Sequence, residues 1–169
     1  MQTTTKKIGL GCDKAAICVY IENIPPLEQY QSLHEVISLK EYDIYNIGQQ
    51  TGNHWRKIFN VYAKLIFEID TYQHSSWQNL RDKELLQSHS NESLFFSPPR
   101  FDTLSSTQIH IIMGRTYAKK LNLDTQCFWL SKDFAINEDK RLIISPYFDY
   151  RQLSNLKITQ LANLIKNFK

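Results

Sequence analysis

The sequence predicts a single α/β domain in three layers, with a mostly parallel central sheet of about four strands and helices on both faces. Apolar runs rich in β-branched residues occur at 16–21, Ile109–Met113 and 142–144, as in strands that are buried on both faces. Helical apolar patterns separate these runs, most clearly over 52–69. Strands that alternate with helices indicate βαβ units, and hence a parallel sheet that helices cover on both sides.

The first half of the chain supplies three of these elements. Pro26 favours a helix start, because its missing amide is not needed there, and a helical pattern then reaches about Leu39. The segment 40–50 is expected to be mostly loop. The helix over 52–69 has an apolar face with steps of three and four residues, and Asn53 is its expected cap.

The second half follows the same alternation. A short helix is expected around 81–87, and a strand over 94–96 that two prolines end. Gly114 lets the strand before it turn directly into a helix. A further apolar run covers 127–130, and Ser154 is the expected cap of the C-terminal helix.

Composition limits the class of protein. The 169 residues are expected to form a flexible polar leader over 1–14 and one domain over 15–169. With 42% hydrophobic and 22% charged residues the chain is typical of globular proteins, and its net charge of +3 is compatible with nucleic-acid binding.

The cysteines and the chain start bear on cofactors and location. The three cysteines Cys12, Cys18 and Cys127 lack paired spacing, which argues against a disulfide framework, a zinc site and an iron–sulfur cluster. We therefore expect no cofactor and no metal. Neither a signal-peptide core nor a run long enough to span a bilayer is present, so a cytoplasmic protein without a membrane partner is expected. The oligomeric state stays open.

Common catalytic and nucleotide-binding motifs are absent. The sequence has no G-x-G-x-x-G, no G-x-x-x-x-G-K-[ST], no H-E-x-x-H and no G-x-S-x-G. Among the histidines, His54 in TGNHW stands at a helix start, where exposed donors can meet an anion. The alternative is that His54 is part of the local helix cap.

Polar and aromatic residues follow several of the expected strands. Because parallel strands end at one edge of a sheet, we expect these residues to converge there: Glu22, Asn23, Ser97, Arg100, Ser145, Tyr147, Phe148, Asp149, Tyr150 and Arg151. The helix starts at Asn53, Gly114 and Ser154 are expected to point the same way. Such an edge suits a phosphate-bearing or planar ligand, since arginines and amides bind oxygens and aromatic rings stack. The alternative for Arg151 is a structural pair with Asp149 or with a neighbouring helix.

Five short motifs follow one another along the chain: VYIENIPP, TGNHWRKIF, LFFSPPR, IHIIMGRTYAKKL and LIISPYFDYRQLSNLKI. Their order resembles the uracil-DNA glycosylase superfamily, in particular its mismatch-specific uracil/thymine branch. That branch carries motifs like G-x-N-P-G, G-N-x-x-W, R-P, G-K-x-A and N-P-S-G in these places. The resemblance covers most of the chain after Ala16. Pro25 and Pro26 replace its Pro-Gly, and Ser145 stands where it has His or Asn.

The resemblance implies a four-stranded parallel sheet, DNA binding without a metal, and extrusion of a base into a pocket. It places the water-positioning residue at Asn23 or Ile24, and the wedge that enters the duplex at 147–151. If the protein is an enzyme, the reaction is N-glycosidic hydrolysis with Asn23 or Glu22 orienting the water. One alternative is a non-enzymatic binding or interaction module on the same fold. Another is an unrelated α/β enzyme whose small phosphorylated substrate is bound by Arg100 and Arg151.

Overall fold

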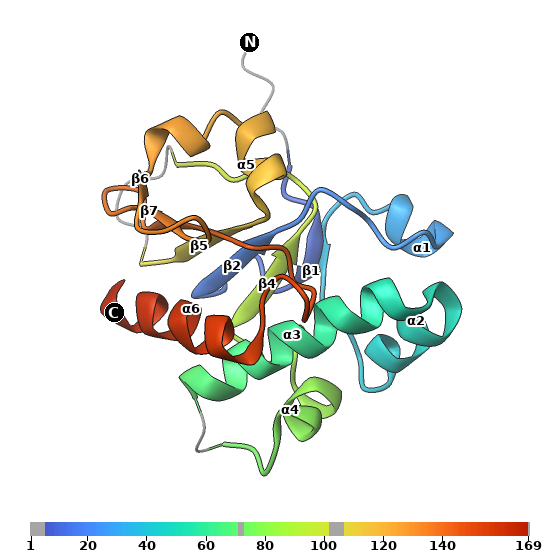
Figure 1. Cartoon of the computed structure of the whole chain (residues 1–169). Helices are drawn as coiled ribbons and strands as arrows, with labels where there is room; N and C mark the ends of the chain where they lie inside the picture. Colours follow the sequence, from blue (N-terminus) through green and yellow to red (C-terminus); the bar gives the residue numbers. More distant parts are fainter. Residues whose placement is uncertain (1–5, 71–72, 102–106, 169) are drawn as a thin grey trace.

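The structure is a computed structural model that describes residues 6–70, 73–101 and 107–168 (Figure 1). In these residues the strands are β1 (Gly9–Gly11), β2 (Ile17–Tyr20), β3 (Val36–Ile37), β4 (Glu92–Phe95), β5 (Ile109–Met113), β6 (Phe128–Trp129), β7 (Ala135–Asn137) and β8 (Leu142–Ser145). The helices are α1 (Glu28–Gln31), α2 (Asp43–Thr51), α3 (Asn53–Ile69), α4 (Trp77–Lys83), α5 (Arg115–Lys120) and α6 (Asn155–Phe168), with a 3-10 turn at Asp124–Gln126.

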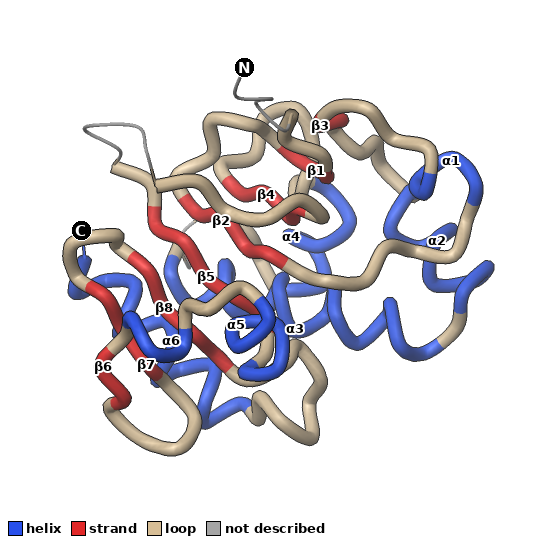
Figure 2. The backbone as a smooth tube through the Cα atoms, turned by 90° about the horizontal axis from the view of Figure 1, so that it is seen from above, coloured by secondary structure: helices blue, strands red, loops and turns tan. Residues whose placement is uncertain are grey.

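The strands form one sheet in the order β3-β1-β4-β2-β5-β8-β7-β6 (Figure 2). Its centre, β4-β2-β5-β8, is parallel throughout. Strand β1 runs antiparallel to β4, and β7 runs antiparallel to both β8 and β6. The fold class is therefore α/β, as predicted, but the sheet has eight strands rather than about four and is partly antiparallel. The added strands are only two or three residues long; β6 lies within the expected apolar run 127–130, whereas β1, β3 and β7 are too short to form a recognisable apolar run.

Strand β1 corrects the expected leader over 1–14. Gly9, Leu10 and Gly11 pair with β4 and are buried, so this part of the expected leader belongs to the sheet. A Cβ atom on Gly9 would lie 2.4 Å from the carbonyl oxygen of Leu94, and one on Gly11 would lie 2.3 Å from that of Glu92. The glycines therefore allow β1 to approach β4 closely, a role that their position before the first long apolar run does not reveal.

Alternate residues of the central strands face two separate cores. Val19, Ile111 and Ile143 pack with the buried faces of α3 and α6. Their neighbours Tyr20 and Ile144 pack with α5 on the other face. Figure 1 shows the same layering, with α3, α4 and α6 on one side of the sheet and α5 on the other. Burial on both faces explains why the central strands are apolar throughout.

Helix α3 is the long amphipathic helix that the sequence predicts, and its buried face packs against the sheet. Tyr62 lies at its centre, fully buried, and donates a 2.7 Å hydrogen bond to the carbonyl oxygen of Ser93 in β4. The expected cap, Asn53, is instead the first helical residue. Gly52 takes the N-cap position, with a φ of 97°. No side chain there makes a capping hydrogen bond to the first backbone amides of α3.

Three other predicted segments differ from the structure. The helix expected to reach Leu39 ends at Gln31, and the β-branched Val36 and Ile37 pair with β1 as strand β3. The segment 40–50, expected as loop, contains most of α2, whose Ile44 and Ile47 are buried. This helix is stabilised by packing on α3, so its own short apolar pattern does not indicate it. Helix α4 begins four residues before the predicted 81–87, where the Ser76 hydroxyl accepts from the amide of Asn79.

Candidate functional site

The carboxyl ends of β2, β5 and β8 and the first turns of α3 lie together at one edge of the sheet. We call six side chains that contact one another there, together with Glu22, whose charge acts on Tyr147, the strand-end rim: Glu22, His54, Lys57, Tyr147, Asp149, Tyr150 and Arg151. They come from the loop after β2, from α3 and from the loop after β8. The predicted convergence therefore holds for part of the expected set.

His54 and Tyr147 connect α3 to the loop after β8. His54 Nε2 and the Tyr147 hydroxyl are hydrogen-bonded at 2.9 Å, and the two rings stack with centroids 5.8 Å apart at 18°. A Cβ atom on Gly114 would lie 3.5 Å from the Tyr147 ring, so this ring also covers the start of α5. Burial, together with the charges of Asp149 and Glu22, raises the pKa of Tyr147 to about 12. Tyr147 therefore keeps its proton at neutral pH and remains a hydrogen-bond donor.

Asp149 holds the loop after β8 against α3. Its Oδ2 lies 3.6 Å from Lys57 Nζ, and its Oδ1 accepts a 2.9 Å hydrogen bond from the backbone amide of Arg151. Asp149 thus pairs with Lys57 and with the backbone, not with the guanidinium of Arg151. The Arg151 side chain lies on the surface. Among the described residues it makes neither the pair with Asp149 nor the pair with a neighbouring helix that was its structural alternative.

Tyr150 presents an exposed aromatic ring with two cations near it. Its relative exposure is 53%, Lys57 Nζ lies 4.7 Å from the ring centroid, and Arg151 Cζ lies 5.8 Å from it. A half-exposed ring with flanking positive charges can stack against a planar group while the cations meet its negative substituents.

Two expected binding residues point into the protein. Phe148 is fully buried and packs edge-on against Tyr62, with ring centroids 5.7 Å apart. Ser145 is 1% exposed, and its hydroxyl donates a 3.0 Å hydrogen bond to the carbonyl oxygen of Pro146. Ser154 is the N-cap of α6, as predicted, with its hydroxyl 3.5 Å from the amide of Lys157. These three side chains support the fold around the rim and are not part of its surface.

The two expected catalytic residues lie after β2 in different states. Glu22 forms an ion pair with Lys120 at the end of α5, with Oε1 and Nζ 2.5 Å apart. Asn23 is exposed and has no hydrogen-bond partner among the described residues. Ile24, the alternative water-positioning residue, packs against the core, where it cannot position a water.

Arg100 and Asn53 lie outside the rim contacts. Arg100 is half-buried beyond β4, and in the described part of the chain its side chain makes no ion pair or hydrogen bond. Asn53 is exposed, and its Oδ1 accepts a 3.4 Å hydrogen bond from Arg56. No side chain caps α3, so the first backbone amides of this long helix add partial positive charge beside His54.

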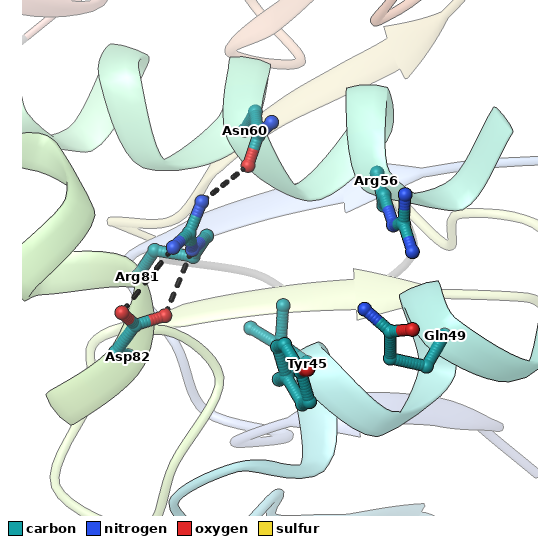
Figure 3. A pocket seen from close by; sticks show the side chains of 7 residues that line it. Tyr45, Gln49, Arg56, Asn60, Arg81 and Asp82 are labelled. Atoms are coloured by element: carbon teal, nitrogen blue, oxygen red, sulfur yellow. Dashed lines mark hydrogen bonds and ion pairs between the residues drawn. The ribbon is translucent and has the colours of Figure 1, made fainter. Parts of the chain in front are cut away.

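A polar groove between α2, α3 and α4 has no counterpart in the sequence predictions. Its cavity of about 120 Å³ is lined by Ile44, Tyr45, Gln49, Arg56, Asn60, Arg81 and Asp82 (Figure 3). Arg81 donates to Asn60 Oδ1 at 2.8 Å and to both carboxylate oxygens of Asp82, at 2.8 and 3.2 Å. The guanidinium of Arg81 is therefore already satisfied within the protein. The sequence does not indicate this groove, because one of its walls, α2, lies in a segment that was expected to be mostly loop.

The described residues contain neither a cluster of metal ligands nor a membrane-spanning helix. No group of three or more His, Cys, Asp and Glu side chains in that part of the chain is placed to hold a metal ion. Within the same residues, every helix is too short or too polar to cross a membrane.

Comparison with known proteins gives a family but not an activity. Neither a curated protein nor a solved structure matches the chain. A family model does match, over residues 8–166, and its description is a family of unknown function, DUF6942. The match covers nearly the whole chain, from β1 to the last turns of α6, and the protein therefore belongs to the DUF6942 family.

Proposed function

We propose that the protein binds nucleic acid through the strand-end rim, with unpaired bases stacking on Tyr150 and phosphates meeting Lys57 and Arg151. The observation that carries this proposal is the exposed Tyr150 ring with the cations of Lys57 and Arg151 near it, in the same loop as Tyr147, which stacks on His54. Aromatic rings interleaved with cations bind single-stranded nucleic acid without strict sequence preference.

Two further features support the proposal. The uncapped start of α3 brings backbone amides to the same edge, where they favour an anion. The four central strands β4-β2-β5-β8 of the eight-stranded sheet are parallel, and this part of the sheet supports the resemblance to uracil-DNA glycosylases. The loop after β8, which that resemblance designates as the wedge entering DNA, is the loop that carries Tyr150 and Arg151.

Binding without hydrolysis is favoured over glycosylase activity. Glu22 is neutralised by Lys120, and Ile24 packs on the core, so neither is suited to orient an attacking water. N-glycosidic hydrolysis remains a second candidate at the same rim. The observation that favours it is the exposed side-chain amide of Asn23 at the end of β2, without a partner among the described residues.

A single phosphate shared by Arg100 and Arg151 has no support. Arg100 follows β4 and Arg151 follows β8, and these strands are three places apart in the sheet. Neighbouring strands lie about 4.8 Å apart, which separates the two strand ends by roughly 14 Å. Among the described residues no contact brings the two guanidinium groups together, so nothing in the structure favours a phosphate shared between them.

The test is binding of the purified protein to labelled single-stranded DNA and to uracil-containing duplex DNA at two salt concentrations. We expect salt-sensitive binding that Arg151→Ala weakens and that Lys166→Ala, a surface change on α6, leaves unchanged. Binding that is absent at low salt, or equally strong in both variants, would rule out the rim as a nucleic-acid site. Release of uracil from the duplex by the wild type, and its loss in Asn23→Ala, would establish the second candidate.

A further inference from the structure

A small pocket opens at the opposite edge of the sheet from the rim, at the amino ends of β2 and β4. Its volume is about 80 Å³, more than the roughly 10–15 Å³ that one water molecule needs. Hydrocarbon covers part of its wall, from Ile17, Ile66, Ile69 and Leu80. We call it the amino-end pocket, with these four residues and the polar residues Asp70, His74, Glu84 and Glu92 as its defining wall.

The polar part of the amino-end pocket is acidic. Asp70 follows the last turn of α3, Glu84 follows α4, and Glu92 opens β4. No lysine or arginine is among the described residues that line it. A group entering this pocket therefore meets three carboxyl groups and a hydrocarbon wall.

Glu92 is the residue of this pocket with an unsatisfied carboxylate oxygen. It is 6% exposed, and its Oε2 is the one buried side-chain oxygen or nitrogen in the described residues without a hydrogen-bond partner. A buried carboxylate oxygen with no donor is unfavourable, because its hydration is lost and nothing replaces it.

His74, the basic residue among the described residues that line the pocket, already has hydrogen-bond partners. Its Nδ1 lies 2.9 Å from Asn79 Oδ1, and its Nε2 is bonded to Glu84 Oε2. Burial lowers the pKa of His74, but the bonds to Asn79 and Glu84 outweigh this and raise it above the ordinary value. His74 thus neutralises Glu84 in part and offers no proton to Glu92.

We propose that the amino-end pocket binds the ammonium group of a short primary alkylamine. Its N–H groups supply the hydrogen bond that Glu92 Oε2 lacks, the negative charges of Glu84 and Asp70 on the same wall favour the cation, and the alkyl part lies on the isoleucine and leucine wall. A metal ion fits less well, since no group of three ligating side chains is placed for one in the described residues and much of the wall is hydrocarbon. This inference concerns the other edge of the sheet and does not depend on nucleic-acid binding.

The protonation of Glu92 couples to this binding. Burial, together with the charge of Glu84, raises the pKa of Glu92 to about 7, against weaker opposing hydrogen bonds from Ser90 and from the backbone at Asn91 and Glu92. Tyr62 of α3 also senses the Glu92 charge, and Asp70 and His74 line the same pocket. An ammonium group favours the charged carboxylate, so binding at pH 7 releases protons and strengthens as the pH rises.

The first experiment measures the melting temperature of the full chain at pH 8 with ethylammonium chloride, against sodium chloride and tetramethylammonium chloride at the same ionic strength. We expect ethylammonium alone to raise the melting temperature, with a dependence on concentration that gives its Kd. Glu92→Gln, which keeps the shape but removes the charge, should weaken binding about tenfold or more, and Glu138→Gln on the surface should not. Glu84→Gln provides a second variant of the pocket.

The second experiment is calorimetry of ethylammonium binding at pH 7 in two buffers of different ionisation enthalpy. The expected result is release of a fraction of a proton in the wild type and none in Glu92→Gln. Nα-acetyllysine amide as a further probe separates a free amine from the side chain of a partner's lysine. The proposal is overturned if tetramethylammonium acts as ethylammonium does, if Glu92→Gln and Glu84→Gln both bind as the wild type does, or if no primary amine binds and the pocket holds water alone.

Discussion

The Tyr20 hydroxyl and His110 Nδ1 form a 2.7 Å hydrogen bond between the neighbouring strands β2 and β5, on the face that α5 covers. Both side chains are buried, at 2% and 5% exposure, and Phe101 packs edge-on against the imidazole at 5.3 Å. Burial, aided by the positive charges of Lys7 and Arg141, lowers the pKa of His110 to about 4. Between about pH 4 and pH 6.5 the His110 imidazole is therefore neutral in the folded protein but protonated in the unfolded chain.

We predict that His110 makes the protein sensitive to mild acid. Its contribution to the free energy of unfolding is fully present above pH 6.5 and is lost as the pH falls toward 4, because only the unfolded state takes up the proton there. The loss amounts to about 3 kcal/mol for a shift of this size. Urea unfolding across this pH range measures it. His110→Phe should have a lower stability at pH 7, since the Tyr20 hydroxyl loses its partner, but a smaller loss in acid. An unchanged acid slope would refute the assignment.

Glu92 acts in the opposite direction over an overlapping range. Its pKa of about 7 lies above the 4.5 of an ordinary glutamate, so the folded state holds the proton more tightly and stability falls as the pH rises from 4.5 to 7. We predict that Glu92→Gln is more stable than the wild type at pH 8 by roughly 1–3 kcal/mol, measured by urea unfolding without added amine. Glu138→Gln on the surface should change little. A Glu92→Gln protein that is less stable at pH 8 would show that the carboxylate is favourably paired.

In the wild type the pH dependences that His110 and Glu92 give to the free energy of unfolding partly cancel. The double variant, with both residues replaced, therefore tests them together. Glu92 pairs in register with Ile17 of one core and His110 with Cys18 of the other, so the two side chains lie on different faces of the sheet and their effects should add. With both residues replaced, the free energy of unfolding should vary less between pH 4.5 and 7 than in either single variant.

A comparison of two glycines tests the close packing of β1 on β4. Gly11→Ala combines a φ of +102° with a Cβ position 2.3 Å from the carbonyl oxygen of Glu92, whereas Gly52 has a similar φ of +97° with nothing within 4 Å. Gly52→Ala should cost about 1–3 kcal/mol from backbone strain alone, because its φ of 97° and ψ of −161° lie in a region that is essentially restricted to glycine. Gly11→Ala should cost roughly 1–3 kcal/mol more, from overlap with β4. Equal losses in thermal or urea unfolding would mean that β1 moves away from β4 readily.

The rim is tested by two tyrosines of similar exposure. Tyr150 is 53% exposed at the rim, and Tyr45 is 61% exposed at the groove between α2 and α4. We predict that Tyr150→Ala weakens binding to single-stranded DNA about tenfold, as expected for loss of one stacked base, while Tyr45→Ala does not. Fluorescence anisotropy at low salt measures both. Equal weakening would move the binding surface away from the rim.

The central architecture follows from the sequence by itself. Strands β2, β5 and β8, and helices α3 and α6, each bury enough consecutive or periodic apolar side chains to be recognised without their neighbours. The convergence of the loops after β2 and β8 follows from the parallel direction of these strands, and it was predictable for the same reason.

Only the tertiary structure decides the edges of the sheet and the direction of individual side chains. Strands β1, β3 and β7 are too short to carry a pattern, and α2 depends on its packing against α3. In the loop after β8, Phe148 turns into the core while Tyr150 turns outward, although both are aromatic and only two residues apart. The bonds of Asp149 to Lys57 and to the backbone of Arg151 hold that arrangement. The contact of Asp149 with Lys57 joins residues far apart in the chain, so it exists only once α3 and the loop after β8 have packed together.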